Sequence, residues 1–205
     1  MKQLLIATRN PGKVREFAQF FADIPDLCIH SLNDLQCPDV EETGNSFQAN
    51  ALLKAQAGAA HSKMPTLADD SGLEVDALDG QPGIGSRRFA GPDATDAHNN
   101  AKLLEQLQHV EESARGAQFR CVLAWVNPAH EKHQIHYEEG ICRGYIAFAA
   151  TGTKGFGYDP IFIPEGYQQS FATLGPEIKR MLSHRARAWQ RMSAYICSQL
   201  DLRSH

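Results

Sequence analysis

Two adjacent carboxylates, Asp69 and Asp70, are the side chains of this sequence that most directly suggest chemistry. They follow a short apolar run and precede a Ser-Gly pair. If that run ends a strand at Ala68, the two acids lie where a sheet opens into a loop, and they point to opposite faces. Carboxylates this close require a cation, a hydrogen-bond donor or a raised pKa. Mg²⁺ would serve. A turn in which Asp side chains bond nearby N–H groups is the alternative.

The segment 8–13 is a second candidate, because it joins a predicted strand over 4–7 to a predicted amphipathic helix over 13–24. A strand, a glycine-containing loop and a helix in this order present backbone N–H groups and a positive helix end to an anion. Lys13 opposes the helix dipole, which indicates a negative group beside it. The GxxxxGK[ST] spacing is absent, and an ordinary turn with a solvated lysine is the alternative.

A third candidate is Phe156, which has a glycine on each side within the loop 151–160. Neighbours without side chains leave the ring uncovered, and an exposed ring of this kind can stack on a base. The alternative is a ring folded back into the core.

The last candidate is the C-terminal segment 177–200, whose apolar residues recur at helical spacing. One continuous helix would place Arg185 on the apolar face, where an unpaired charge is costly. A break at Ser183 removes the conflict, because Ser183 would cap a helix starting at His184. Lys179, His184 and Arg185 would then surround a positive helix end suited to an anionic or carbonyl-bearing ligand. A surface or core histidine is the alternative for His184.

The remaining elements must position these segments. Runs rich in β-branched and aromatic residues predict strands over 27–32, 118–126 and 133–148, the last two as an antiparallel hairpin and its continuation. Thr43, Asn45 or Ser46 would cap one further helix, and Thr95 another. Glu41 and Glu42 lie in the polar turn before the first of these helices, as solvated acids or as metal ligands.

Composition limits the classes of function. At 205 residues the chain fits one domain or two closely joined lobes. A net charge of −4 does not indicate binding to bulk nucleic acid or to an acidic membrane, because such binding typically requires a basic surface. The five scattered cysteines show no CxxC spacing and indicate a reducing compartment. The apolar run near the N-terminus is too short for a signal peptide, and no window approaches a membrane span, so we expect a cytoplasmic protein.

Together these segments predict one ligand, a nucleoside triphosphate with Mg²⁺. Its phosphates would bind the Lys13 loop, its metal ion would bind the carboxylates, and its base would stack on Phe156. Five motifs then carry a family resemblance in order along nearly the whole chain: 7–13 (ATRNPGK), 41–44 (EETG), 68–73 (ADDSGL), 156–160 (FGYDP), and Lys179 with 183–185 (SHR). They closely resemble the noncanonical purine nucleoside triphosphate pyrophosphatases, the inosine/xanthosine triphosphatase family of bacterial dITP/XTP type.

The resemblance implies an α/β fold over 1–205 as a single inosine-triphosphatase-like domain, with a mixed elongated sheet and flanking helices in two lobes and the active site in the cleft between them. It also implies Mg²⁺-dependent hydrolysis of ITP, dITP and XTP to the monophosphate and pyrophosphate, usually by a homodimer. The runner-up is a related pyrophosphatase acting on modified pyrimidine or other nucleotides. A nucleotide sensor without turnover and a nucleic-acid-binding domain that stacks bases on Phe156 are the alternatives outside that class.

Residue roles follow from the resemblance position by position. The resemblance implies that Asp70 is the general base. It also implies that Glu41 and Asp70 bind the metal ion. Substrate contacts are implied for Thr8, Arg9, Asn10, Pro11, Gly12, Lys13, Ser71, Phe156, Gly157, Tyr158, Asp159, Lys179, His184 and Arg185. Members of this family frequently have Gly at the position of Arg9, and the arginine could add a phosphate contact. The variant loop 85–89 leaves open which of Arg87 and Arg88 faces the ligand.

Overall fold

The strands of the computed structural model, which describes residues 1–22, 24–129 and 134–202, form a six-stranded sheet in the order β2-β1-β3-β4-β5-β6. They are β1 (Lys2–Ile6), β2 (Leu27–Ser31), β3 (Thr66–Val75), β4 (Gly116–Asn127), β5 (Gln134–Ile146) and β6 (Phe162–Pro164). β1 pairs in parallel with β2 and β3, whereas β5 and β6 are antiparallel, so the sheet is mixed, as predicted. β4 and β5 are neighbours, as the expected hairpin requires; His133, at the start of its second predicted run, lies outside the described residues.

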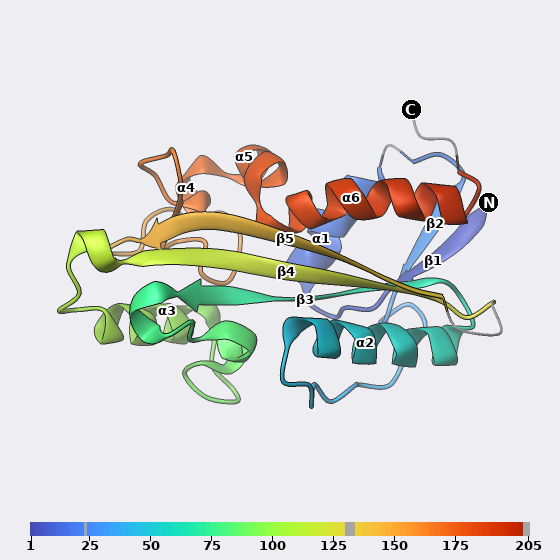
Figure 1. The fold of residues 1–205 in the computed structure, drawn as a ribbon, viewed down its shortest axis with the longest axis horizontal. Helices are drawn as coiled ribbons and strands as arrows, with labels where there is room; N and C mark the ends of the chain where they lie inside the picture. Colours follow the sequence, from blue (N-terminus) through green and yellow to red (C-terminus); the bar gives the residue numbers. More distant parts are fainter. Residues whose placement is uncertain (23, 130–133, 203–205) are drawn as a thin grey trace. The chain divides into compact units, whose positions relative to one another are not determined.

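The helices are α1 (Pro11–Phe21), α2 (Phe47–Ser62), α3 (Asp96–Gln106), α4 (Phe171–Leu174), α5 (Pro176–Leu182) and α6 (His184–Gln199) (Figure 1). The predicted cap Thr95 is confirmed, and of the three candidates for the other helix Ser46 is the cap. Ser46 accepts a hydrogen bond from the first turn of α2, and Thr95 accepts one from the first turn of α3. The predicted break at Ser183 is also confirmed, because α5 ends and α6 begins on either side of it. Among the described helices, none is both long and apolar enough to cross a membrane.

The start of α1 corrects the prediction of a loop through residue 13 and a helix over 13–24. The helix begins at Pro11 and ends at Phe21, and Asp23 lies outside the described residues. Proline is favourable in the first helical turn, where its missing N–H would be unpaired anyway. Asn10 caps the helix, since its Oδ1 accepts hydrogen bonds from the next free N–H groups at 2.8 and 3.2 Å.

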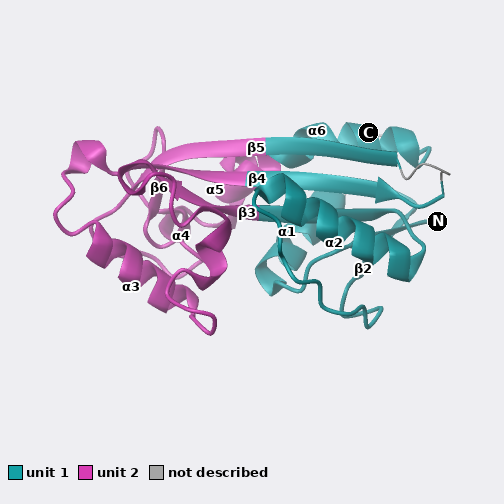
Figure 2. Cartoon of the chain, turned by 60° about the horizontal axis from the view of Figure 1, so that its bottom comes forward, with its two compact units in different colours: residues 1–70, 121–139, 188–205 teal, residues 71–120, 140–187 magenta. Residues whose placement is uncertain are grey.

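The chain divides into two compact units, each with its own core (Figure 2). Unit 1 comprises residues 1–70, 121–139 and 188–205, and unit 2 comprises residues 71–120 and 140–187. The strands β3, β4 and β5 contribute residues to both units. The first boundary falls between Asp70 and Ser71, inside β3. The prediction of a single domain over 1–205 stays a prediction.

Unit 1 has apolar layers on both faces of its strands. Leu4 of β1 and Leu67 of β3 lie in one core cluster with residues of α1 and α6. Their neighbours Leu5 and Ala68 lie in another, with Ala51 and other small residues of α2. Because side chains alternate along a strand, this places α2 on the face opposite to α1 and α6 (Figure 1).

Unit 2 packs its helices around the remaining lengths of the long strands. Its core cluster joins Leu73 of β3 and Phe119 of β4 to Leu103 of α3, Phe162 of β6 and Phe171 of α4. Rings of Phe119 and Phe162 lie 4.6 Å apart between centroids. This core supports the loop that carries Phe156 and the ends of α5 and α6.

Candidate active site

The acidic pair Asp69-Asp70 lies inside β3, and not at the strand end that the sequence predicted. β3 continues to Val75, and both carboxylates are buried. Aspartate is depleted in strands because its side chain competes for local backbone groups. That preference is overridden here because each carboxylate meets a lysine from a helix packed on its own face of the sheet. The prediction that the two acids point to opposite faces is confirmed.

Asp69 lies on the α1 side of β3 and pairs with Lys13. The lysine Nζ is 3.0 Å from Asp69 Oδ2, and the aspartate side chain is fully buried. The negative group that the position of Lys13 indicated is therefore present within the protein. Asp69 holds the start of α1 against β3.

Asp70 lies on the α2 side and shares a lysine with a second acid. Lys54 Nζ is 3.1 Å from Asp70 Oδ1 and 2.8 Å from Glu42 Oε1. Burial raises the pKa of Asp70 above its usual value, an effect that the charges of Lys54 and Lys13 oppose without cancelling. Burial alone would lower the pKa of Lys54, but the combined attraction of Asp70, Asp69 and Glu42 raises it. A carboxylate with a raised pKa is suited to accept a proton.

The other oxygen of Asp70 has the properties of a ligand for a hard cation. Within the described part of the chain, Asp70 Oδ2 is buried and has no hydrogen-bond partner. Carboxylate oxygens are what Mg²⁺ prefers, and buried polar atoms are normally paired. Glu42 is half-buried beside Lys54, whereas Glu41 is exposed. No group of three His, Cys, Asp or Glu side chains is gathered for a metal in the described residues, so a divalent ion here would take substrate or water oxygens as further ligands.

The anion loop 8–13 is organised by its own side chains. Thr8 Oγ1 accepts from the N–H of Asn10 at 3.2 Å, and Asn10 in turn occupies the N–H groups of Gly12 and Lys13. An anion at this helix end would therefore be held first by side chains. Arg9 faces the turn that follows β2: its Nε lies 2.6 Å from Asp39 Oδ1, and its guanidinium also donates to Asn33 and to the Cys37 carbonyl.

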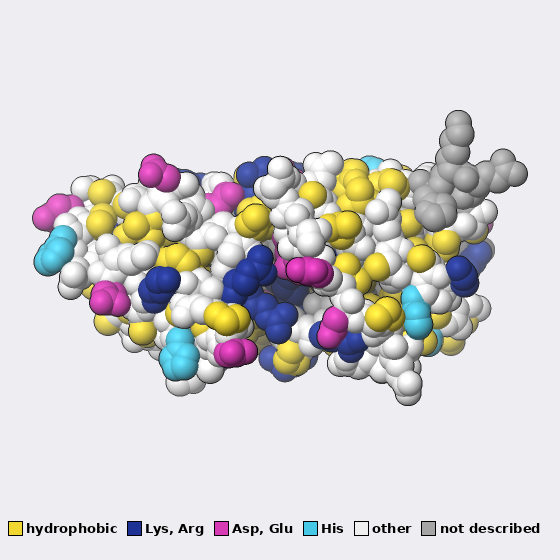
Figure 3. Space-filling view, turned by 90° about the horizontal axis from the view of Figure 1, so that it is seen from below, with side chains coloured by type: hydrophobic (Ala, Val, Ile, Leu, Met, Phe, Trp, Pro, Cys, Tyr) yellow, Lys and Arg dark blue, Asp and Glu magenta, His cyan; other side chains and the backbone are white. Residues whose placement is uncertain are grey.

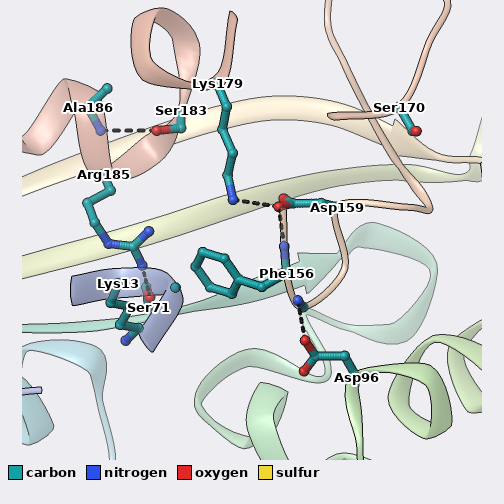
Figure 4. A network of polar contacts seen from close by, with 12 residues as sticks. Lys13, Ser71, Asp96, Phe156, Asp159, Ser170, Lys179, Ser183, Arg185 and Ala186 are labelled. Atoms are coloured by element: carbon teal, nitrogen blue, oxygen red, sulfur yellow. Dashed lines mark hydrogen bonds and ion pairs between the residues drawn. The ribbon is translucent and has the colours of Figure 1, made fainter. Parts of the chain in front are cut away.

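In unit 2 the Phe156 ring lies beside two cations (Figure 4). Lys179 Nζ is 4.2 Å and Arg185 Cζ is 6.0 Å from the ring centroid. Phe156 is half-buried and does not belong to the core cluster of this unit. The alternative of a ring folded back into the core is therefore wrong, and the use of the ring as a stacking platform stays a prediction.

Asp159 organises the loop that carries this ring. Its Oδ2 accepts from Lys179 Nζ at 2.6 Å and from the N–H of Phe156 at 2.9 Å, and the residue is buried. Tyr158 is buried as well, and its hydroxyl donates to the Ser86 carbonyl at 2.8 Å. The side chains of these two residues therefore build the loop. A substrate contact from Tyr158 would use its backbone.

The start of α6 brings together the other predicted contacts of unit 2. Ser183 caps the helix by accepting from the N–H of Ala186 at 3.2 Å. Arg185 is buried and donates to Ser71 Oγ at 2.8 Å. His184 is buried too, and its ring stacks on Phe119 with 4.8 Å between centroids. The stacking on Phe119 fits the reading of a histidine held in the core.

Arg87 and Arg88 end a short 3₁₀ helix, Gly83–Arg88, and both are exposed. On the face shown in Figure 3, several basic side chains gather near the middle with acidic and apolar ones beside them, and the other basic side chains are scattered singly. That pattern differs from the basic stripe of a nucleic-acid-binding surface.

Sequence reasoning did not select three residues that the structure places at these groups: Lys54, Asp96 and Asn100. It named Glu42 as a solvated acid or a metal ligand, and the structure pairs it with Lys54. Lys54 carried a usable signal, since it lies among alanines on the buried face of α2, where a lone charge is costly. The same argument identified Arg185. Asp96 accepts a hydrogen bond from the N–H of Gly157, and Asn100 donates one to the Gly157 carbonyl. Gly157 is far from both residues in the sequence, so no local pattern indicates these contacts.

Comparisons with known proteins identify the family and the fold. The Ham1 family model matches residues 4–195. A dITP/XTP pyrophosphatase of Geobacillus kaustophilus is 49% identical over 92% of this chain and 91% of its own. One of Methylococcus capsulatus is 46% identical over 91% of this chain and 92% of its own. The solved structure of a HAM1 protein from Coxiella burnetii is 37% identical and superposes with a TM-score of 0.85 over 97% of this chain and 100% of its own.

Proposed function

The chain belongs to the Ham1 family, and from that premise we propose that it is a pyrophosphatase that hydrolyses noncanonical purine nucleoside triphosphates. ITP, dITP and XTP would each yield the monophosphate and pyrophosphate, which removes them from the nucleotide pool. The names of its relatives support dITP and XTP as substrates. The fold, shared over nearly the whole chain with solved Ham1 structures, supports the same reaction.

The observation that carries this proposal is the setting of Asp70. It is a buried carboxylate with a raised pKa, with Lys54 on one oxygen and the other oxygen unpaired among the described residues. Asp70 would orient a water molecule and accept its proton. The water oxygen forms a bond to the α-phosphorus as the bond to the bridging oxygen of the β-phosphate breaks, and pyrophosphate leaves with that electron pair. Positioning a base in this way contributes typically about 10²–10⁴-fold.

Charge neutralisation is the second task of the site, because phosphoryl-type transfer requires mainly positioning and electrostatic stabilisation. Lys13 would face the phosphates together with Thr8 and Asn10. Mg²⁺ is the cofactor we propose, held by Asp70 and an acid of the pair Glu41-Glu42. When bound, the ion would neutralise charge on the phosphates and the leaving group.

Selection of the base would take place in unit 2. The 6-oxo group of hypoxanthine or xanthine can accept a hydrogen bond from Lys179, His184 or Arg185 as the ring stacks on Phe156. Adenine carries a 6-amino group in that place and would leave buried donors unpaired, a mismatch that can discriminate by about 10⁴-fold or more. A homodimer in the cytoplasm is the assembly and location we propose from the family resemblance, and sedimentation of the purified protein tests the dimer.

The test is pyrophosphate and monophosphate release from a panel of ITP, dITP, XTP, GTP, ATP and modified pyrimidine triphosphates, with and without Mg²⁺. We expect Mg²⁺-dependent turnover of the first three and about 10²–10⁴-fold less with the variant Asp70→Asn. Preference for a pyrimidine would establish the related pyrophosphatase instead. Tight binding without turnover would make the protein a nucleotide sensor.

A further inference from the structure

Helix α3 holds two loops of unit 2 through side chains that sequence analysis did not select. Asn99 accepts from the N–H of Ala90 at 2.8 Å and donates to the Arg87 carbonyl at 2.9 Å. Lys102 donates to the Phe89 carbonyl at 2.7 Å. These contacts fix the segment after the short helix Gly83–Arg88 to one side of α3.

Two further residues of α3, Asp96 and Asn100, hold the loop that carries Phe156. Asp96 Oδ2 accepts from the N–H of Gly157 at 2.6 Å (Figure 4), and Asn100 Nδ2 donates to the Gly157 carbonyl at 3.1 Å. Asp96 and Asn100 are four residues apart and therefore project from the same side of the helix. Both polar groups of one glycine are bound by one helix.

The bound glycine directly follows the stacking ring. Gly157 has a φ of +63°, a backbone conformation that other residues rarely adopt. On the other side of the ring, the N–H of Phe156 is bound by Asp159. The backbone is thus fixed immediately before and after the Phe156 side chain, by Asp159 and by α3. The direction in which the ring leaves the backbone depends on these contacts.

We propose that Asp96 and Asn100 are specificity-determining positioning residues, which fix the Phe156 ring where it stacks on the purine base. The proposal rests on the proposed function, because it assigns Phe156 to the base. Neither residue touches the reacting atoms; both act through Gly157. The loop would hold the same conformation with and without substrate. Binding of the base would therefore not have to include the entropic cost of ordering the ring.

The expected effect concerns binding of the base more than the chemical step. Base–aromatic stacking is strong enough that its loss weakens binding by about tenfold or more. In Asp96→Ala the N–H of Gly157 loses its acceptor, and we expect KM for ITP to rise about tenfold with a smaller change in kcat. The preference for ITP over ATP should fall, since a displaced ring no longer aligns the 6-oxo edge of the purine with its donors.

Three variants separate this role from a merely structural one. Asp96→Asn keeps an oxygen that can accept from Gly157 and should restore KM to within about twofold of wild type. Asn100→Ala should resemble Asp96→Ala. Glu105→Ala is the matched control, since it removes an exposed carboxylate from the same helix, and its KM should equal that of wild type. Inhibition by inorganic triphosphate, which has no base, should be unchanged in all of them.

A double-mutant cycle with Phe156→Ala completes the test. If Asp96 acts through the ring, Asp96→Ala should have little further effect on KM in the Phe156→Ala background. Additive effects, an equally impaired Asp96→Asn, or a parallel loss of triphosphate inhibition would overturn the proposal. Failure of the proposed function is distinguishable, because then the wild type and Glu105→Ala would themselves show no preference for ITP.

Discussion

Replacing Lys54 by methionine tests the electrostatic account of Asp70. The substitution keeps an unbranched stem within α2 and removes the ammonium group between Asp70 Oδ1, at 3.1 Å, and Glu42 Oε1, at 2.8 Å. At an effective dielectric constant of about 20, a pair of unit charges 3.1 Å apart attracts with about 5 kcal/mol. Lys54 no longer has to be desolvated in the variant, and the Glu42 side chain is 31% exposed. We therefore expect a net loss of about 3 kcal/mol, at the lower end of the range for breaking a buried pair.

The loss should depend on pH in a defined direction. Burial raises the pKa of Asp70 in the folded protein, and Lys54 is the strongest opposing influence. Stability that comes from protonated Asp70 is present below the pKa of the unfolded chain and is lost as the pH rises through the raised folded pKa. Removing Lys54 raises that pKa further. The variant should therefore be close to wild type in acid and clearly less stable at neutral pH.

Catalysis should follow the same titration. Asp70, the base that we propose, can accept a proton only when it is ionised, so the acid limb of the kcat/KM profile should move to higher pH in Lys54→Met. Urea unfolding at two pH values and pyrophosphate release across pH are the measurements. Lys2→Met, which removes an exposed lysine, is the control. An acid limb that stays in place, or a destabilisation equal at both pH values, would refute the reasoning.

Three further substitutions test other contacts. Asp69→Asn leaves the ammonium of Lys13 beside a neutral amide, and urea unfolding should show a loss of about 3 kcal/mol, while a loss below about 0.5 kcal/mol would contradict the pairing. Ser46→Ala removes the cap of α2 and should cost about 1 kcal/mol, seen as a lower Tm. Ser86→Ala deprives the buried N–H of Leu73 of its acceptor at 2.9 Å and should cost about 1–3 kcal/mol in the same unfolding assay.

Local signals in the sequence predicted local structure well. Thr95 and Ser183 were identified as caps, and Ser46 was one of three candidates, because a cap acts within about three residues of its own position. The start of α1 was placed too late, because Pro and Gly were interpreted as breaking the helix when Pro11 occupies its first turn. Asp69 and Asp70 were placed at a strand end, because sequence spacing does not show that lysines from two helices would compensate them inside β3.

Contacts between distant segments could not be predicted. Asp96 and the N–H of Gly157 are 61 residues apart, and an aspartate in the first turn of a helix has a sufficient local explanation in the helix dipole. The buried position of Lys54 indicated that it needs a partner, but the identity of its partners Glu42 and Asp70 depends on how α2 lies on β3. Family resemblance supplied the roles of the matched motifs, and it did not extend to residues outside those motifs.

The small side chains of α2 have a consequence for engineering this protein. A Cβ added at Gly58 would lie 3.0 Å from both Leu5 Cδ2 and Thr66 Cγ2, so the helix rests directly on the strands. Lys54 reaches Asp70 from this same helix, and helix-to-sheet spacing therefore sets the separation of ammonium and carboxylate. Larger residues introduced at Ala51, Ala55 or Gly58 to improve thermal tolerance would change that separation, and with it the pKa of Asp70. If Asp70 is the base that we propose, variants selected in this layer for stability should also differ in their pH optimum.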